Sequence, residues 1–250
     1  KLEKSINLLQ EYGKIDYITI SDPFIVHYFK KKFPNIKLQS SIYMGIDNIH
    51  KAREAIKMGI TALTLDPSVN RSKSKLKEIM RLKLDYPAIS IKLIGILTCY
   101  SDCFYAWNHS QLSILKQIML KIKKEVPNKM IGEELSPFRC YYESTKKIDE
   151  LRRPFIRPED ISYYEKNKLT DFIKIAYRNE ETILLKKKLI AYFDKKLKGN
   201  LFSLFDSTKH EGLFCDNEKI PPNFIEKVMN CDKDCNNCNY CTELYEEVCK

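Results

Sequence analysis

The 250-residue chain contains little glycine and no long apolar run. With only seven glycines, no glycine-rich loop follows any predicted strand, which disfavours nucleotide-binding doubly wound folds. No stretch approaches the roughly 18 apolar residues of a membrane span; the longest candidate, residues 89–99, is of strand length and is interrupted by Lys92. Neither Gly-x-Ser-x-Gly nor His-Glu-x-x-His occurs, so serine-hydrolase and zincin chemistry lack sequence support.

The start of the chain lacks an initiator methionine and the apolar core of a signal peptide. We therefore expect a fragment or a processed product, in the cytoplasm and without a membrane segment. In such a setting, clustered cysteines indicate metal or redox chemistry rather than disulfides.

Lysine dominates the charge of the chain. The formal net charge is +10, from 43 basic and 33 acidic residues. A basic excess suits a polyanion such as RNA. However, only eight of the 43 are arginine, the residue that readers of nucleic-acid bases usually enrich. The lysine bias typical of AT-rich genomes accounts for the charge as well, so RNA is an allowed partner but not a required one.

Strand and helix patterns alternate about every 25 residues along the first two thirds of the chain, which is typical of βαβ units and a buried parallel sheet. Strands are predicted at residues 16–20, 36–44, 61–65, 89–97 and 170–176. Helices are predicted at residues 22–33, 47–58, 74–84, 111–125 and 181–197, with Gly59 and Gly199 as C-caps.

These patterns predict an α/β fold, a TIM-type (β/α) barrel over residues 1–199, followed by a cysteine-rich tail over residues 200–250. Five strands are fewer than the eight of a complete barrel. We therefore expect the barrel to be incomplete in this chain, with a partner protein or a missing N-terminal segment to complete it.

Nine cysteines are the most informative part of the composition. Cys99 and Cys103 directly follow the strand at 89–97, at the end of parallel strands where sites are built, and Cys140 can converge on them. The sequence predicts that these three thiolates bind an iron–sulfur cluster. Three ligands leave one iron open to substrate, which would make the cluster catalytic.

A second cysteine set lies in the tail, with the dense spacing of iron–sulfur or zinc ligands: Cys231, Cys235, Cys238 and Cys241. The spacing begins like the motif of radical enzymes that use S-adenosylmethionine, but that motif belongs after the first strand of a barrel. We expect either two 4Fe-4S clusters or a single one that a tail cysteine completes. Zinc is the alternative metal. Cys215 and Cys249 are isolated in the sequence, and we expect each to be either a fourth cluster ligand or an unused thiol.

The order of several short motifs resembles the peptidase U-thirty-two (U32) family. The motifs are Ile20-Ser21-Asp22-Pro23, Leu38-Gln39-Ser40-Ser41, residues 58–66, the Cys99 loop, residues 155–160 and residues 171–178. The resemblance covers about residues 13–205. It implies a TIM-type barrel with cluster-binding cysteines. Some members of the family are implicated in oxygen-independent hydroxylation of ubiquinone precursors or RNA, and others are known as collagenase-like peptidases.

The chain departs from the family pattern in three places. In the family, the Ser-Asp-Pro strand end lies near the middle of the barrel, which implies that the first βα units are absent here. The family stretch Lys-Ile-Glu-Gly-Arg appears as Lys174-Ile175-Ala176-Tyr177-Arg178, so the role of its acidic residue does not carry over. Ser162 stands near the position of a further family cysteine.

Three predicted site residues are polar side chains at or after strand ends. Asp22 is a substrate ligand or base, or alternatively a helix N-cap. Ser40 ends the second strand, either at the barrel mouth or as a strand–loop hydroxyl. His109, six residues after Cys103, is a proton donor, a cluster ligand or a loop histidine.

Basic residues complete the predicted site. Arg157 and Arg178 would bind an anionic substrate, or alternatively pair with Glu159 or Glu165. Lys174 is included from the family-like stretch.

Together these residues predict an iron–sulfur enzyme of anaerobic type. It resembles oxygen-independent hydroxylases and would modify a small molecule, RNA or a peptide. A non-catalytic iron–sulfur redox or RNA-binding subunit and a peptidase-like zinc protein are the alternatives.

Overall fold

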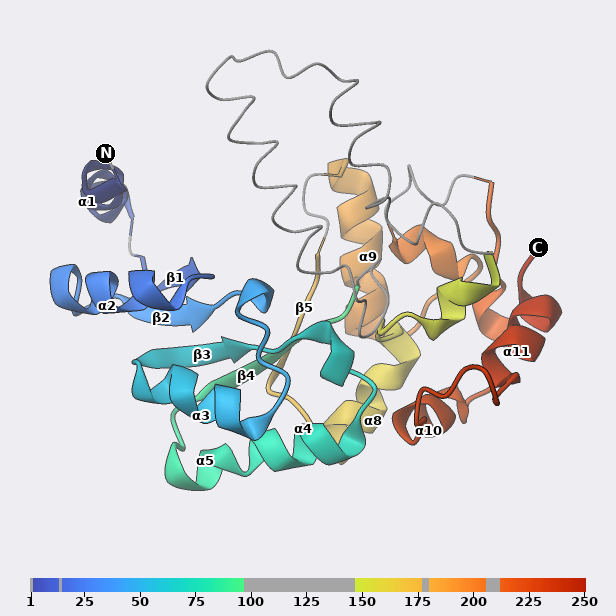
Figure 1. Ribbon diagram of the computed structural model, residues 1–250. Helices are drawn as coiled ribbons and strands as arrows, with labels where there is room; N and C mark the ends of the chain where they lie inside the picture. The colour runs from blue at the N-terminus through green and yellow to red at the C-terminus, as the bar shows by residue number, and fades with distance from the viewer. Residues whose placement is uncertain (1, 14, 97–146, 177–179, 206–211) are drawn as a thin grey trace, which may run out of the picture. The chain divides into compact units, whose positions relative to one another are not determined.

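The computed structural model describes residues 2–13, 15–96, 147–176, 180–205 and 212–250 (Figure 1). These residues form two compact units. The first unit takes the described residues within 1–96, 155–197 and 223–231, and the second takes the others. The predicted division at residue 199 into barrel and tail stays a prediction, because the units draw on different stretches of the chain.

A five-stranded parallel sheet forms the centre of the first unit. Its strands lie in chain order, and every neighbouring pair is parallel. They are β1 (Tyr17–Ile20), β2 (Lys37–Ser40), β3 (Ile60–Thr64), β4 (Ser90–Ile94) and β5 (Phe172–Lys174). The order never reverses, as it would in a doubly wound sheet. The predicted α/β fold is therefore confirmed, whereas a closed barrel is not, since β1 and β5 are edges of the described sheet.

Short helices connect and follow the strands of this unit (Figure 1). They are α1 (Leu2–Tyr12), α2 (Pro23–Lys32), α3 (Ile49–Lys57), α4 (Lys73–Met80), α5 (Leu82–Asp85), α8 (Ile161–Lys166), α9 (Thr182–Asp194) and α10 (Phe224–Met229). No described helix is long and apolar enough to cross a membrane.

Local signals set several helix ends. The Asp22 carboxylate accepts a hydrogen bond from the Phe24 amide at 2.8 Å and begins α2. Gly59 follows α3 with φ +103°, a conformation that side chains disfavour. By contrast, α9 is capped by Lys195 in a left-handed conformation rather than by Gly199, so the predicted cap lies four residues too late.

One face of the sheet is apolar and buried. Alternate strand residues share a face, and the register places Leu38, Leu63, Ile91 and Leu93 together. All four side chains are buried. A parallel sheet in chain order places its right-handed crossover helices on one face, and α2 and α3 contact β1 and β3. Helix packing therefore covers this face.

The first unit also includes α10, which the sequence places in the tail. Phe224 at the start of α10 is fully buried and stacks on Phe155, with ring centroids 6.4 Å apart. The guanidinium carbons of Arg71 and Arg157 lie 5.3 and 4.9 Å from the centre of the Phe224 ring. Helix α10 therefore packs within the first unit.

The second unit combines short helical turns with one longer helix. These are η5 (Lys147–Arg152), η7 (Leu201–Leu204), η8 (Asn217–Lys219) and α11 (Tyr240–Val248). Helix α11 packs on η5, where Arg152 donates a hydrogen bond to the Thr242 hydroxyl at 3.0 Å.

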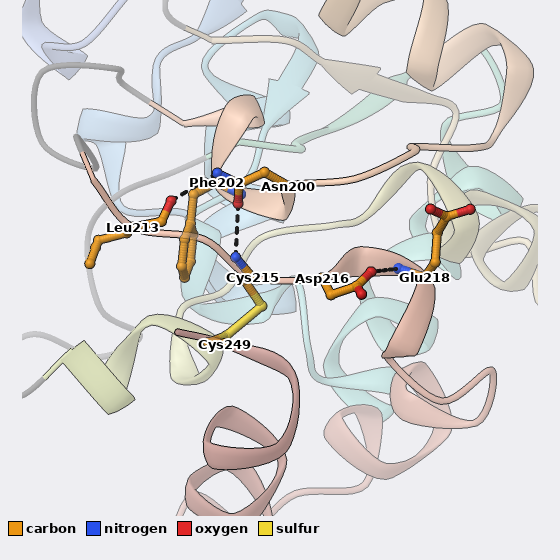
Figure 2. Close-up of a disulfide and its surroundings, with 7 residues drawn as sticks. All are labelled: Asn200, Phe202, Leu213, Cys215, Asp216, Glu218 and Cys249. Carbon is orange, nitrogen blue, oxygen red and sulfur yellow. Dashed lines mark hydrogen bonds between the residues drawn. A yellow bond between two sulfur atoms is a disulfide. The ribbon is translucent and has the colours of Figure 1, made fainter.

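A disulfide joins Cys215 to Cys249 in the second unit (Figure 2). The two residues face each other in an antiparallel bridge, and the Lys250 amide donates to the Phe214 carbonyl at 2.7 Å beside it. The Asn200 side chain accepts a hydrogen bond from the Cys215 amide at 2.9 Å. The expectation that these cysteines are ligands or unused thiols was wrong, because backbone pairing brings residues 34 positions apart into contact.

Candidate functional site

The second face of the sheet carries the lysines of the strands. We call it the lysine face and define it by the side chains that the register places together: Tyr17, Thr19, Lys37, Gln39, Ala62, Thr64, Ser90, Lys92, Ile94, Phe172 and Lys174. Three of these are lysines, and none of the strand residues in β1 to β5 is Asp or Glu. The face is therefore electropositive and built without internal ion pairs between strands.

A row of hydrogen bonds crosses this face. The Gln39 amide nitrogen donates to the Thr19 hydroxyl at 3.1 Å. This contact orients the amide so that its oxygen accepts a hydrogen bond from the Lys92 ammonium. Residues from β1, β2 and β4 are thus connected through side chains alone, and Lys92 is held in one position.

Two aromatic rings flank Lys92. Its ammonium lies 5.2 Å from the ring centre of Tyr17 and 5.7 Å from that of Phe172. These residues come from the two edge strands, which four strand spacings would place about 19 Å apart in a flat sheet. Side chains from both edge strands of the described sheet thus reach the Lys92 ammonium.

Partial burial perturbs Lys92. Removal from water disfavours the ammonium form and lowers the pKa of Lys92 below its usual value. No ion pair among the described residues includes Lys92. A half-buried lysine with a lowered pKa and no carboxylate partner among the described residues is a candidate for ligand binding or catalysis.

Asp22 and Lys174 lie at or just beyond the carboxyl ends of their strands. Asp22 follows β1 and is exposed, and its carboxylate caps α2. Lys174 ends β5 and pairs in register with Ile94 of β4. Because all strand pairs are parallel, both residues lie toward the end of the sheet where the strands have their carboxyl ends.

Ser40 also ends a strand but points the other way. The register pairs it with Ile20, on the face opposite Gln39, and it is fully buried. Its hydroxyl accepts a hydrogen bond from the Thr64 amide at 2.8 Å and donates to the Thr64 carbonyl at 3.3 Å. Ser40 therefore joins β2 to β3 next to the register shift between these strands.

Arg157 is buried and ion-paired. Its guanidinium donates to the Asp160 carboxylate, with the shortest contact at 2.8 Å, and both side chains are 2% exposed. The pairing with Glu159 or Glu165 weighed from the sequence was wrong. Glu159 accepts from the Leu197 amide, and Glu165 pairs with Lys195 at 2.5 Å.

Several predicted site residues lie outside the described residues. They are Cys99, Cys103, Cys140, His109 and Arg178. Of the tail cysteines, Cys231, Cys235 and Cys238 are exposed and Cys241 is half-buried.

The described residues do not form a metal site. Within them, no three His, Cys, Asp or Glu side chains come together to hold a metal ion. Binding of a cluster or zinc by the four tail cysteines stays a prediction.

A cavity of about 260 Å³ lies beside β5, between α8 and α9. Its lining is mostly apolar and includes Ile173, which shares the buried face with Leu93. Two carboxylates reach the lining, but Asp171 pairs with Lys83 and Glu165 with Lys195, each at 2.5 Å. Both carboxylates of the lining are therefore ion-paired, and Phe172 of the lysine face also lines this cavity.

Sequence reasoning did not select Lys92, Gln39 or Tyr17 as site residues. The one available signal was the position of Lys92 inside an otherwise apolar strand. The hydrogen-bond partner Gln39 is 53 positions from Lys92 along the chain, and the two flanking rings are farther away. No local sequence pattern therefore predicts these contacts.

Comparison with known proteins identifies a relative by sequence. No family model matches the chain. An uncharacterized protease of Methanocaldococcus jannaschii is 27% identical over 243 residues, which is 94% of this chain and 67% of that protein.

Among solved structures, a U32 peptidase aligns with a TM-score of 0.42 and 15% identity. The alignment covers 69% of this chain, which spans 58% of the length of that structure. Over nearly its whole length the chain is similar to a protein named a protease, and one of the solved structures to which it is similar is a U32 peptidase.

Proposed function

We propose that the chain is the substrate-binding part of an enzyme, with its active site at the carboxyl end of the sheet and on the lysine face. The observation that carries this proposal is Lys92, half-buried on the lysine face without a carboxylate partner among the described residues. In parallel α/β folds, the carboxyl ends of the strands are where substrates bind. Asp22 and Lys174 lie toward that end.

The chemistry that we propose first is iron–sulfur-dependent modification of a small molecule, RNA or peptide, such as oxygen-independent hydroxylation. Its support is the spacing of Cys99, Cys103 and Cys140, of which the first two follow β4. A 4Fe-4S cluster would supply redox chemistry and an open iron. Lys92 and Lys174 would bind and orient the substrate.

Anaerobic metal analysis tests this chemistry. The chain purified without oxygen should be brown, with iron and sulfide in a ratio of about one and about four irons per cluster. Cys103→Ser should remove iron from the cluster of Cys99, Cys103 and Cys140. Cys238→Ser distinguishes one cluster from two, because it removes a second set of irons if the tail holds its own cluster. Tightly bound zinc without sulfide, in a colourless protein, would overturn the proposal.

Peptide hydrolysis is the second candidate, because the sequence relative is named a protease. Within the described ranges, neither His27 nor His50 hydrogen-bonds to a hydroxyl or thiol, so these residues provide no nucleophile–base pair. Incubation with a mixed peptide library, read by mass spectrometry, separates the candidates. Cleavage by both the wild type and Cys103→Ser would favour a peptidase over a cluster enzyme.

We also propose that further strands, from a missing segment or a partner protein, pair with the sheet edges. Phe172 in β5, an edge strand of the described sheet, is 56% exposed, and Phe193 on α9 is 83% exposed; edge strands are open to pairing. Hydrogen exchange of the outward amides of β1 and β5 should be fast in this chain and slow in a longer form. Equal protection in both forms would contradict the idea.

A further inference from the structure

We propose that the lysine face binds an anionic oxygen group, a carboxylate or a phosphate, directly on the Lys92 ammonium. The aromatic or apolar part of the same molecule would lie between the rings of Tyr17 and Phe172. This inference rests on the proposed function only in naming the bound molecule a substrate, because the binding itself needs no turnover.

The charge distribution is the first argument. Lys37, Lys92 and Lys174 share one face of a sheet whose strands contain no acidic residue. A charge that is partly removed from water is normally paired with an opposite charge. Lys92 instead has a neutral amide oxygen as its hydrogen-bond acceptor. An arriving anion would supply the countercharge that the fold leaves out.

The donor geometry is the second argument. A lysine ammonium has three N–H donors, and the described contacts of Lys92 use one of them, toward Gln39. Because Thr19 fixes the Gln39 amide, the ammonium is pre-oriented rather than free to rotate over the surface. A preformed site of this kind loses little side-chain entropy when a ligand binds.

The two rings are the third argument. Tyr17 and Phe172 are partly exposed, at 39% and 56%, although both are large and apolar. Their ring centres lie 5.2 and 5.7 Å from the Lys92 ammonium. Aromatic faces stack on planar groups, so a ligand with a planar group next to its anion would use both parts of the site.

Four small anions and one neutral analogue test the proposal on the full 250-residue chain. Phenyl phosphate and benzoate carry a ring, methyl phosphate and acetate do not, and benzamide has the ring without the charge. Binding is measured by calorimetry and by the NMR shifts of isotope-labelled lysine side chains, with the Lys92 signal assigned from Lys92→Arg. The phosphates and carboxylates together show which anion the site prefers.

The Lys92 signal should shift with phenyl phosphate or benzoate, and Lys92→Met should weaken that binding about tenfold or more, as the loss of a charged hydrogen bond does. The matched control is Lys57→Met, an exposed lysine paired with Glu54 on α3, which should bind as the wild type does. Phe172→Leu should weaken phenyl phosphate more than methyl phosphate. The NMR shifts on the wild type stand even if a variant fails to fold.

Two results would overturn the proposal: no shift of the Lys92 signal with any of the anions, or equal affinity for benzamide and benzoate. Its failure is separable from failure of the proposed function. If the chain turns over a neutral substrate and Lys92→Met leaves that turnover unchanged, only the anion-binding proposal is wrong. Anion binding in a chain without catalytic activity would sink the enzyme proposal alone.

Discussion

Truncating Phe224 should destabilise the sheet unit, although the residue is far from the sheet in sequence. The ring is fully buried and touches Phe155 and two guanidinium groups, those of Arg71 and Arg157. Phe→Ala in a core costs about 3–5 kcal/mol, through lost burial and the cavity left behind. We expect the upper half of that range, because both guanidinium groups also lose a cation–π contact of about 0.5–2 kcal/mol each.

Hydrogen exchange is the suitable assay, because it reports the stability of each unit separately. The amides of Leu63 and Leu93, in β3 and β4, should lose about 4 kcal/mol of protection in Phe224→Ala. The matched control is Phe193→Ala, whose ring is 83% exposed and whose truncation should cost within about 0.5 kcal/mol. A loss below about 1 kcal/mol in β3 and β4, or a loss confined to α11, would refute the packing argument.

Four further predictions concern single contacts. Reducing the disulfide of Figure 2, which joins residues 34 positions apart, should lower the unfolding free energy of the second unit by about 3–4 kcal/mol, as read from exchange protection in α11 with and without reductant. Ser40→Ala should cost about 1–3 kcal/mol in urea unfolding, because a buried amide loses its acceptor; an unchanged midpoint would contradict the hydrogen bond. Asp160→Asn should cost about 3–5 kcal/mol, since it leaves the buried Arg157 charge without a carboxylate, and thermal unfolding that matches the wild type would speak against the pair. Burial lowers the pKa of Lys92 below 10.5, the usual lysine value. Anion affinity should therefore already decline below pH 10.5, as the ammonium loses its proton. If anion affinity depends on pH in the same way in Lys92→Met, Lys92 is not the site.

The order of the elements was predictable because their signals are local. Asp22 and Pro23 start a helix through one carboxylate–amide contact and one fixed φ angle, and neither depends on the rest of the chain. The same holds for Gly59 after α3. The second strand is shorter than predicted, 37–40 instead of 36–44, because residues 42–44 form a helical turn that Ser41 caps.

The candidate site was predictable only in part. The sequence singled out strand-end residues, yet alternation along β2 places Ser40 on the buried face and Gln39 on the lysine face. A shift of one residue in pairing would exchange those roles. The partner of Arg157 was likewise misjudged, because Asp160, Glu159 and Glu165 are all near in sequence and only the backbone path selects among them.

By itself, the sequence determined the α/β class, the five strands in their order and the starts of α2, α3, α4 and α9, because those depend on contacts within a few residues. Only the tertiary structure decided that Tyr17, Gln39 and Phe172 surround Lys92, that Phe224 belongs with the sheet, and that Cys215 pairs with Cys249. These contacts join residues tens of positions apart. Strand register and packing set them, and no short stretch of sequence contains that information.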